Sequence, residues 1–399
     1  MSSKLTVVYN SFGGRYSDSP RAIYSALRRR RQDGRHVWLS ESAHTHSFPP
    51  DVEIAPRGGA WVDALESADV VVSNSYLDLE WRKRPNTVYL QSWHGTPLKR
   101  IHFDALWSRP GRLESLAPDI ARWDYLVSPN ARSTPVLRSA FGFAGDVLET
   151  GYPRNDVLHW TGRDRVRARV RRELGIPDGV TAVLYTPTWR DEVFYGSAGS
   201  VPLELDVDDF VAHLGDDHCL LVRAHYLMAD RLHGASHAQV RDVSGYPEIS
   251  ELYLAADLLV TDYSSTMFDF AVTGKPILFY AYDLAHYRDV LRGFYFELAD
   301  HAPGPLVTTT SQLIEALRDL PALREAFAGR YAQFREEFCH LDDGHATERV
   351  LARLFPEAAR RAERPAHRRA VGRQPAVRQF DGPAHGEAGP VAAVASSTE

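Results

Sequence analysis

The chain has 399 residues, and its 46 lysines and arginines against 52 aspartates and glutamates give a formal net charge of −6. Hydrophobic residues make up 44% and charged residues 25% of the sequence, which is typical of a globular protein large enough for two ordinary domains. The acidic balance argues against nucleic acid, or any other polyanion, as a partner of the whole molecule.

Cysteine usage and hydropathy bear on the location of the protein. The two cysteines, Cys219 and Cys339, have neither metal-ligand nor redox spacing, which fits a reducing compartment and excludes a disulfide framework. The N-terminal residues run directly into a predicted strand without a signal-peptide pattern, and no apolar run reaches about 18 residues. We therefore expect the protein in the cytosol or at the membrane surface that faces it.

Strand and helix signals alternate through residues 1–158. Ser19 as N-cap and Pro20 at the first helical position predict a helix over residues 21–30, after a Gly- and Ser-rich connection. This alternation predicts a Rossmann-like domain with a parallel sheet that is covered on both faces. The expected strands are Leu5–Tyr9, Val37–Leu39, Asp69–Ser73, Thr87–Gln91, Tyr125–Ser128 and Val147–Thr150, with a helix over Thr134–Phe141.

A second alternating series occupies residues 159–355 and predicts a second Rossmann-like domain. Its expected strands are Ala182–Tyr185, Leu220–Arg223, Leu258–Thr261 and Ile277–Tyr280. Its expected helices are Arg163–Leu174, Asp208–Leu214, Glu248–Ala256, Ser265–Thr273, Ser311–Leu317, Ala322–Phe338 and Gly344–Leu354. Residues 356–399 are rich in Arg, Pro and Ala without apolar periodicity, so we expect a disordered tail.

Basic residues cluster in three segments. Four consecutive arginines, Arg28–Arg31, favour the C-terminus of a helix through its dipole, and residues 163–172 form a strongly basic helix. The arginine-rich tail is the third segment. Each can be an ordinary solvated surface or a contact with an anionic membrane.

The stretch Thr87–Arg100 is the one around which the chain is organised. A short apolar strand ends at Gln91, and Pro97 predicts the first turn of a helix, so His94 would lie in the loop at the carboxyl end of the strand. Ligands bind there in open α/β sheets, and a helix start favours an anion. Proton transfer beside a phosphate fits a histidine in this loop; a histidine that caps a structural turn fits as well.

A second segment, residues 258–270, reads as a strand, a hydroxyl-rich turn and a helix. Ser264 and Ser265 stand at the helix start, where they could be a simple cap or a cradle for phosphate oxygens. Three other polar turns are residues 185–190, residues 223–225 and residues 342–347. No Asp/Glu cluster has metal-ligand spacing, so we expect neither a metal nor a cofactor.

Five ordered motifs carry a family resemblance. They are Trp-His-Gly-Thr-Pro-Leu-Lys (93–99), Thr-Pro-Thr-Trp-Arg (186–190), Arg-Ala-His (223–225), Thr-Asp-Tyr-Ser-Ser with Phe-Asp-Phe (261–270) and Asp-Asp-Gly-His-Ala-Thr (342–347). This set resembles the signature of the CDP-glycerol:poly(glycerophosphate) glycerophosphotransferase family, the teichoic-acid primases and polymerases. The resemblance implies two Rossmann-like domains in a GT-B-like arrangement with the active site in the cleft between them.

The resemblance also implies roles for single residues. His94 and His225 would be catalytic, with His94 as general base and His225, together with Arg190, near the phosphates or the leaving CMP. The turns at Ser264 and at Gly344 would hold the nucleotide diphosphate. The full set of expected substrate-binding residues is Gly95, Thr96, Arg190, Arg223, Thr261, Asp262, Ser264, Ser265, Asp343, Gly344 and Thr347.

The implied reaction is attack of an acceptor hydroxyl on the β-phosphorus of CDP-glycerol, with release of CMP. The expected partners are CDP-glycerol, a lipid-linked glycan or polyol-phosphate acceptor, and an anionic membrane surface. The chain lacks the long helical extension of the large polymerases, which favours a short, primase-like member at the inner face of the membrane. Two alternatives stay open: a ribitol-phosphate or nucleotide-sugar transferase of the same fold, and a non-catalytic nucleotide-binding protein at the membrane.

Overall fold

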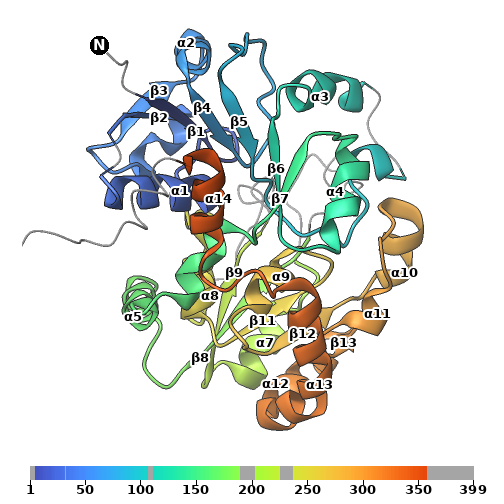
Figure 1. Ribbon diagram of the computed structural model, residues 1–399. Coiled ribbons are helices and arrows are strands. Elements are labelled where there is room, and N and C mark those ends of the chain that lie inside the picture. The colour runs from blue at the N-terminus through green and yellow to red at the C-terminus, as the bar shows by residue number, and fades with distance from the viewer. Residues whose placement is uncertain (1–4, 32, 107–110, 189–202, 225–236, 357–399) are drawn as a thin grey trace, which may run out of the picture. The chain divides into compact units, whose positions relative to one another are not determined.

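Two parallel sheets organise the chain in the computed structural model, which describes residues 5–356 apart from 32, 107–110, 189–202 and 225–236 (Figure 1). The described residues belong to one compact unit. The tail expected over residues 356–399 lies outside the described residues from position 357 onward. The limits predicted for the two domains stay predictions.

The first sheet has the strand order β3-β2-β1-β4-β5-β6-β7, and all its neighbouring strands are parallel. Its core places Val8 and Val71 against α2 on one face and Val7 and Tyr9 against α1 on the other. The strands are β1 (Thr6–Asn10), β2 (Arg35–Ser40), β3 (Glu53–Pro56), β4 (Val70–Ser73), β5 (Val88–Gln91), β6 (Tyr125–Ser128) and β7 (Asp146–Glu149). The helical segments are α1 (Asp18–Arg29), η1 (Ser42–Ser47), α2 (Gly59–Ser67), η2 (His102–Asp104), α3 (Arg112–Ile120), α4 (Ser133–Phe141) and η3 (Pro153–His159).

The second sheet has the order β10-β9-β8-β11-β12-β13 and is also parallel throughout. Its strands are β8 (Thr181–Thr186), β9 (His218–Val222), β10 (Val240–Asp242), β11 (Leu258–Thr261), β12 (Ile277–Tyr280) and β13 (Leu306–Val307). Its helical segments are α5 (Arg163–Glu173), α7 (Val207–Leu214), α8 (Ile249–Ala255), α9 (Thr266–Ala271), α10 (Leu284–His286), η5 (Tyr287–Leu291), α11 (Leu298–His301), α12 (Thr310–Arg318), α13 (Leu320–Phe338) and α14 (Ala346–Leu354). Two parallel sheets of this kind confirm the predicted α/β, GT-B-like fold class.

Three strands that the sequence analysis missed, β3, β10 and β13, all lie at sheet edges. An edge strand has one neighbour and a wetter surface, so it does not need the continuous apolar run that marks a central strand. The predicted cap of the first helix was also wrong. The helix begins at Asp18 with Ser17 at the N-cap, and Pro20 is its third residue, where its missing N–H has no intrahelical partner to lose.

The helix predicted to begin at Pro97 was wrong as well. Residues 92–101, called the His94 loop below, form no helix and reach the segment that follows η5, where Lys99 and Phe294 make an isolated antiparallel bridge. The N–H of Arg100 donates to the carbonyl of Gly293 at 2.9 Å, and the N–H of Tyr295 donates to that of Leu98 at 2.8 Å. These long-range bonds use backbone groups that a helix would need.

The basic helix α5 uses several of its arginines for packing. Arg167 and Arg171 pair with Asp257 at 2.7 and 3.0 Å, and both also donate to carbonyls at the end of α8. Cations stabilise such an end because its carbonyls carry partial negative charge. These two arginines therefore stabilise the second sheet and its helices.

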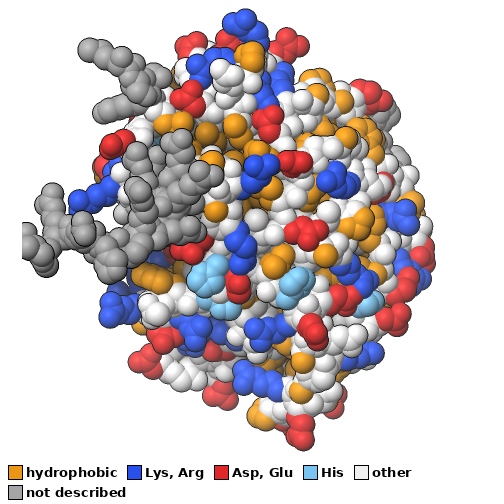
Figure 2. All heavy atoms as spheres, in the orientation of Figure 1, with side chains coloured by type: hydrophobic (Ala, Val, Ile, Leu, Met, Phe, Trp, Pro, Cys, Tyr) orange, Lys and Arg blue, Asp and Glu red, His pale blue; other side chains and the backbone are white. Residues whose placement is uncertain are grey.

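The arginine run at the end of α1 is paired in part. Arg28 lies 3.5 Å from Asp51 and Arg30 lies 3.8 Å from Glu348. Basic and acidic side chains are interspersed over the face drawn in Figure 2. Among the described residues, none of the helices combines the length and the apolar character that crossing a bilayer requires. A contact of Arg28–Arg31 with a membrane stays a prediction.

The last helix, α14, returns to the first sheet and lies beside α1 (Figure 1). Val350 and Leu351 are buried in the same core cluster as Tyr9 and Trp38. The second sheet is thus interposed in the sequence between β7 and the helix that completes the core of the first.

We expect Leu351→Ala to lower the free energy of unfolding by about 2–5 kcal/mol, because it removes a fully buried side chain and leaves a cavity. Urea denaturation measures the change. Ala352→Gln on the exposed side of the same helix is the control, with an expected change within about 0.5 kcal/mol. Equal midpoints for both variants would contradict this account of α14.

Candidate functional site

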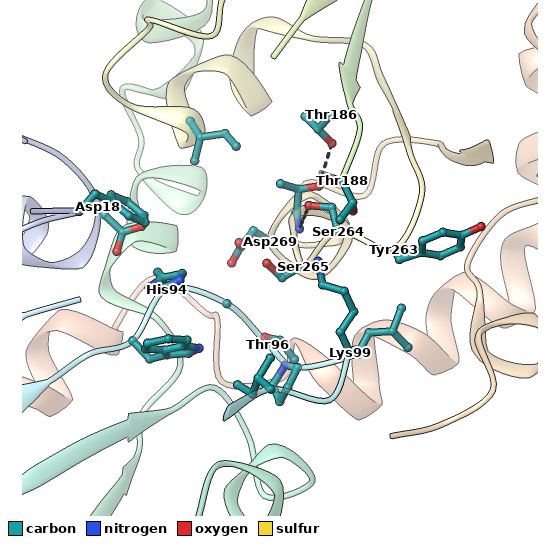
Figure 3. A pocket seen from close by; sticks show the side chains of 18 of the residues that line it. Asp18, His94, Thr96, Lys99, Thr186, Thr188, Tyr263, Ser264, Ser265 and Asp269 are labelled. Atoms are coloured by element: carbon teal, nitrogen blue, oxygen red, sulfur yellow. Dashed lines mark hydrogen bonds between the residues drawn. The ribbon is translucent and has the colours of Figure 1, made fainter. Parts of the chain in front are cut away.

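A cavity of about 700 Å³ lies where strand ends of the two sheets face each other (Figure 3). Residues that follow β1, β5, β8, β9 and β11 line it, as expected for ligand sites in parallel sheets. Of the predicted site residues, it brings together His94, Gly95, Thr96, Arg223, Ser264 and Ser265. Thus the two main predicted motifs meet in one cavity.

His94 is held by the first sheet in a defined tautomer. Its Nδ1 lies 2.5 Å from the carbonyl oxygen of Asn74, and since a carbonyl only accepts, Nδ1 carries the proton and donates it. Its ring also packs on Trp93, with ring centroids 3.9 Å apart. Burial lowers the pKa of His94 below the ordinary 6.5. The imidazole is therefore neutral near pH 7, with the Nε2 lone pair available.

Gly95 places the His94 loop against the turn of the second sheet. A Cβ atom at this position would lie 2.6 Å from Oγ and 3.0 Å from Cβ of Ser265. Only glycine allows this approach without a shift of one loop. Beside it, Thr96 is buried in the wall of the cavity.

The Ser264–Ser265 turn presents hydroxyl groups to the cavity at the start of α9. Ser265 occupies the N-cap position without a side-chain capping bond, and Ser264 Oγ accepts the N–H of Thr266 at 3.4 Å, a long contact. The capping interpretation is therefore weak. In Figure 3 the side chain of Lys99 extends from the His94 loop toward this turn.

Thr261 and Asp262 lie behind the cavity wall and bond to residues that line it. Thr261 Oγ1 donates to the carbonyl of Thr186 at 2.9 Å, and the Asp262 carboxylate accepts the N–H and the hydroxyl of Thr188. Thr186 and Thr188 line the cavity, whereas Thr261 and Asp262 do not. The structure thus gives these two predicted residues the role of holding the loop after β8.

Arg223 enters the cavity from the end of β9. Its guanidinium donates to the carbonyls of Val243 and Tyr246 at 3.1 and 2.7 Å, and burial lowers its pKa. The other two residues predicted for this wall, Arg190 and His225, lie outside the described residues.

The predicted residues Asp343, Gly344 and Thr347 line a second cavity, of about 670 Å³, with which the first shares Asp18, Arg154 and Glu248. The N–H groups of Ala346 and Thr347 donate to the carboxylate of Asp156 at 3.0 and 2.8 Å. A protein carboxylate thus occupies the helix start at which a phosphate was expected.

Asp343 itself is committed to an ion pair. Its carboxylate lies 2.8 Å from Arg349, and hydrogen bonds from this arginine lower its pKa to about 2. An ionised carboxylate repels a nucleotide diphosphate. The substrate-binding role of this turn stays a prediction.

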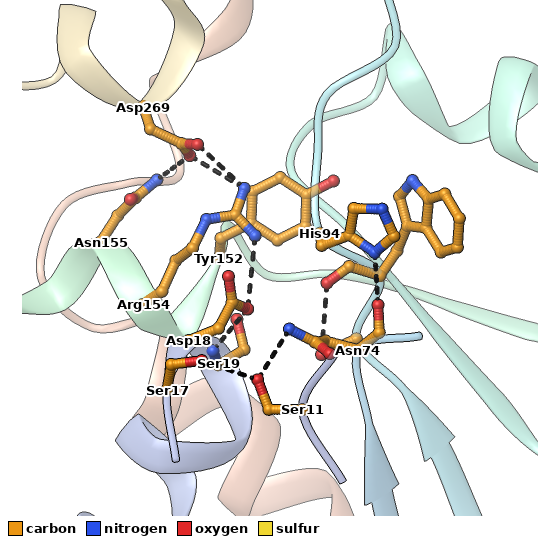
Figure 4. Close-up of polar contacts among 12 residues, drawn as sticks. Ser11, Ser17, Asp18, Ser19, Asn74, His94, Tyr152, Arg154, Asn155 and Asp269 are labelled. Atoms are coloured by element: carbon orange, nitrogen blue, oxygen red, sulfur yellow. Dashed lines mark hydrogen bonds and ion pairs between the residues drawn. The ribbon is translucent and has the colours of Figure 1, made fainter. Parts of the chain in front are cut away.

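A buried ion network that the sequence analysis did not find adjoins His94 (Figure 4). Arg154 Nη2 lies 3.0 and 3.1 Å from the two carboxylate oxygens of Asp269, and Nη1 lies 3.6 Å from Asp18. All three side chains are less than 10% exposed. Asp18 begins α1, Arg154 lies in η3 and Asp269 stands in the Phe-Asp-Phe motif, but a single charge in a local pattern does not reveal that it is buried.

The lining is cationic on balance. Three carboxylates, of Asp18, Glu248 and Asp269, face seven cationic side chains: Arg15, Lys99, Arg100, Arg112, Arg154, Arg223 and Arg292. Among the described residues, no group of three or more His, Cys, Asp and Glu could hold a metal ion. Such a cavity is suited to an anionic ligand.

Comparison with known proteins gives a consistent picture. Residues 2–356 match the family model described as CDP-Glycerol:Poly(glycerophosphate) glycerophosphotransferase. The chain is 38% identical over 363 residues to the teichoic acid poly(glycerol phosphate) polymerase of Bacillus subtilis, covering 88% of this chain and 48% of the relative. It is 36% identical over 365 residues to the teichoic acid glycerol-phosphate transferase of Staphylococcus aureus, covering 88% of this chain and 93% of the relative.

A solved structure of the wall teichoic acid polymerase TagF superposes with a TM-score of 0.81 at 35% identity, covering 90% of each chain. The match covers 48% of the B. subtilis relative, so the chain spans about half the length of that protein. Fold and family therefore agree over nearly all of the described residues.

We expect Arg154→Met to lower the free energy of unfolding by about 3–5 kcal/mol at pH 7.5, because it leaves buried carboxylates without their cation. Burial raises the pKa of Asp269, and Arg154 opposes that rise, so in the variant the pKa of Asp269 rises further. The folded variant then favours the protonated acid, and its deficit relative to the unmodified protein grows as the pH rises past the pKa that Asp269 has in the unmodified protein.

Urea denaturation of this variant at pH 5 and pH 7.5 measures the effect. Arg35→Met, which breaks an exposed pair with Glu53, is the control, with an expected loss below about 1 kcal/mol at either pH. A deficit for Arg154→Met that stays the same between pH 5 and pH 7.5 would argue against charge as its cause.

Proposed function

Because the chain belongs to the CDP-glycerol:poly(glycerophosphate) glycerophosphotransferase family, we propose that it transfers glycerol phosphate from CDP-glycerol to a hydroxyl of an acceptor and releases CMP. The observation that carries the proposal is the neutral His94 ring, fixed by Asn74 in a cationic cavity and adjacent to the Ser264–Ser265 turn. A base, cations and hydroxyls in one cavity are what phosphoryl transfer requires.

In the proposed reaction, the acceptor oxygen bonds to the β-phosphorus of CDP-glycerol. The bond from this phosphorus to the bridging oxygen breaks, and CMP leaves with that oxygen. His94 Nε2 takes the proton of the acceptor hydroxyl, and the Nδ1–H···O=C bond to Asn74 keeps the ring oriented as it becomes cationic. Asp18 lowers the energy of this cation, because its charge raises the pKa of His94.

Charge on the transferred group is balanced by side chains that line the cavity. Lys99 extends toward the hydroxyls of Ser264 and Ser265, which places a cation and two donors near one another (Figure 3). Arg223 adds a cation from β9. These groups bind the diphosphate of the donor on the side of the second sheet.

The same proposal gives the acceptor a lipid anchor and places the protein at the inner face of the cell membrane. The names of the two relatives described above both refer to teichoic acid. A peripheral position would bring the cavity to such an acceptor.

CMP release from CDP-glycerol by the full-length protein, with and without a lipid-linked sugar or glycerol phosphate acceptor, tests the proposal. We expect acceptor-dependent release of CMP. CDP-ribitol and a nucleotide sugar are the comparison donors, and faster turnover of either would assign the other transferase activity. Binding of CDP-glycerol without CMP release on any acceptor would favour a non-catalytic protein.

We expect His94→Ala to lower kcat by about 10²–10⁴, the usual contribution of a positioned base. In the unmodified protein, activity should fall on acidification, because protonation removes the base. Since burial holds the pKa of His94 below 6.5, the midpoint of this fall in kcat/KM should lie below pH 6.5.

His44→Ala, in η1 and outside the residues that line the cavity, is the matched control and should keep kcat within about twofold. CMP release across pH 5–8 reports both quantities. Retention of the acidic limb in His94→Ala, or a fall in kcat below tenfold, would remove His94 from the role of base.

A further inference from the structure

The two ends of the cavity differ in charge. All three carboxylates of the lining gather around Arg154: Asp18 and Asp269 pair with it, and Glu248 accepts the N–H of Asp18 at 2.9 Å. At the other end, the end of the His94 loop, the start of α3 and the residue after η5 contribute arginines, and no carboxylate lines this end among the described residues. These arginines are Arg100, Arg112 and Arg292.

Contacts between backbone and side chains bring these three segments together. The hydroxyl of Tyr295 donates to Asp104 at 2.7 Å, and Arg100 pairs through its N–H with Gly293 at 2.9 Å. A Cβ at Gly293 would lie 3.1 Å from Leu106, so the chain around η2 lies directly beside the residues after η5. Leu113 and Leu116 of α3 complete this end of the wall.

His102 shows that the charges converge there. Burial and then the nearby His94, Arg112 and Arg292 lower its pKa to about 3, so the ring is neutral at physiological pH. The Trp93 ring packs on both histidines, with its centroid 3.9 Å from that of His94 and 5.1 Å from that of His102. This cationic end therefore begins next to the proposed base.

We propose that Arg112 and Arg292, with Arg100 at the rim, bind a phosphate group of the acceptor. The inference rests on the proposed function, in which the hydroxyl to be activated lies at His94. An acceptor whose last unit is a glycerol phosphate carries an anion close to that hydroxyl, and guanidinium groups suit phosphate oxygens. The cavity thus selects an acceptor that already carries a phosphate over a neutral sugar.

Lipid headgroups are another source of phosphate at this end. Three exposed apolar side chains, Phe103, Leu106 and Val290, lie on η2, just after it and on η5, at 47%, 56% and 59% exposure. The acceptor is favoured because Arg112 and Arg292 line the cavity that contains His94. The exposed pair of Arg112 with Asp78, at 3.4 Å, competes only weakly for this side chain.

The test uses Arg112→Gln/Arg292→Gln in the full-length protein, with each single variant as a check on folding by thermal midpoint. Arg288→Gln is the matched control, because Arg288 lies in η5, pairs with Glu297 at 3.0 Å and does not line the cavity. Calorimetry with a synthetic glycerol phosphate trimer, without donor, measures binding directly. We expect at least tenfold weaker binding by the double variant, a change within about twofold for the control, and loss of affinity with added salt.

Kinetics supply the second readout. The ratio of kcat/KM on the trimer to kcat/KM on a neutral sugar acceptor should fall at least tenfold in the double variant. Equal trimer affinity in the double variant and the unmodified protein overturns the proposal. So does selective loss of binding to phosphatidylglycerol vesicles with trimer affinity retained, which would assign the arginines to lipid. If no CMP is released on any acceptor but trimer binding still depends on these arginines, the proposed function fails and the phosphate site stands.

Discussion

The structure depends on one buried guanidinium. Arg154 lies in the turn that carries the chain from the first sheet to the second, and it bonds to Asp269 of α9 while facing Asp18 of α1. A charge so buried is stable only with partners, and its partners come from both halves. The same network acts on the pKa of His94, which the charge of Asp18 raises and that of Arg154 lowers. The ion network around Arg154 therefore both joins the two halves of the structure and influences the proposed proton transfer at His94.

Sequence periodicity predicted the interior of both sheets well. Strands β6, β11 and β12 match their predicted ranges, because central parallel strands are apolar on both faces and begin and end at clear turn signals. The prediction of a helix at Pro97 was wrong because this segment pairs with residues 293–295, which lie nearly two hundred positions away in the sequence. No local pattern contains that information.

The candidate site was predictable to the same degree. His94 and the Ser264–Ser265 turn were found because each follows a recognisable strand, and parallel topology brings strand ends together. The turn at Asp343 had equally good local chemistry, yet Asp156 occupies its N–H groups. Arg154, Asp18 and Asp269 were missed as a group, because burial and pairing belong to the fold rather than to any one segment.

The return of α14 to the first sheet bears on how the protein is made. A nascent chain that has finished β7 contains all seven strands of the first sheet, but not Val350 and Leu351 of its core. The whole second sheet leaves the ribosome before that helix does. Until then the surface around Tyr9 and Trp38 stays partly uncovered, so the first half, although it is synthesised first, reaches its final stability last.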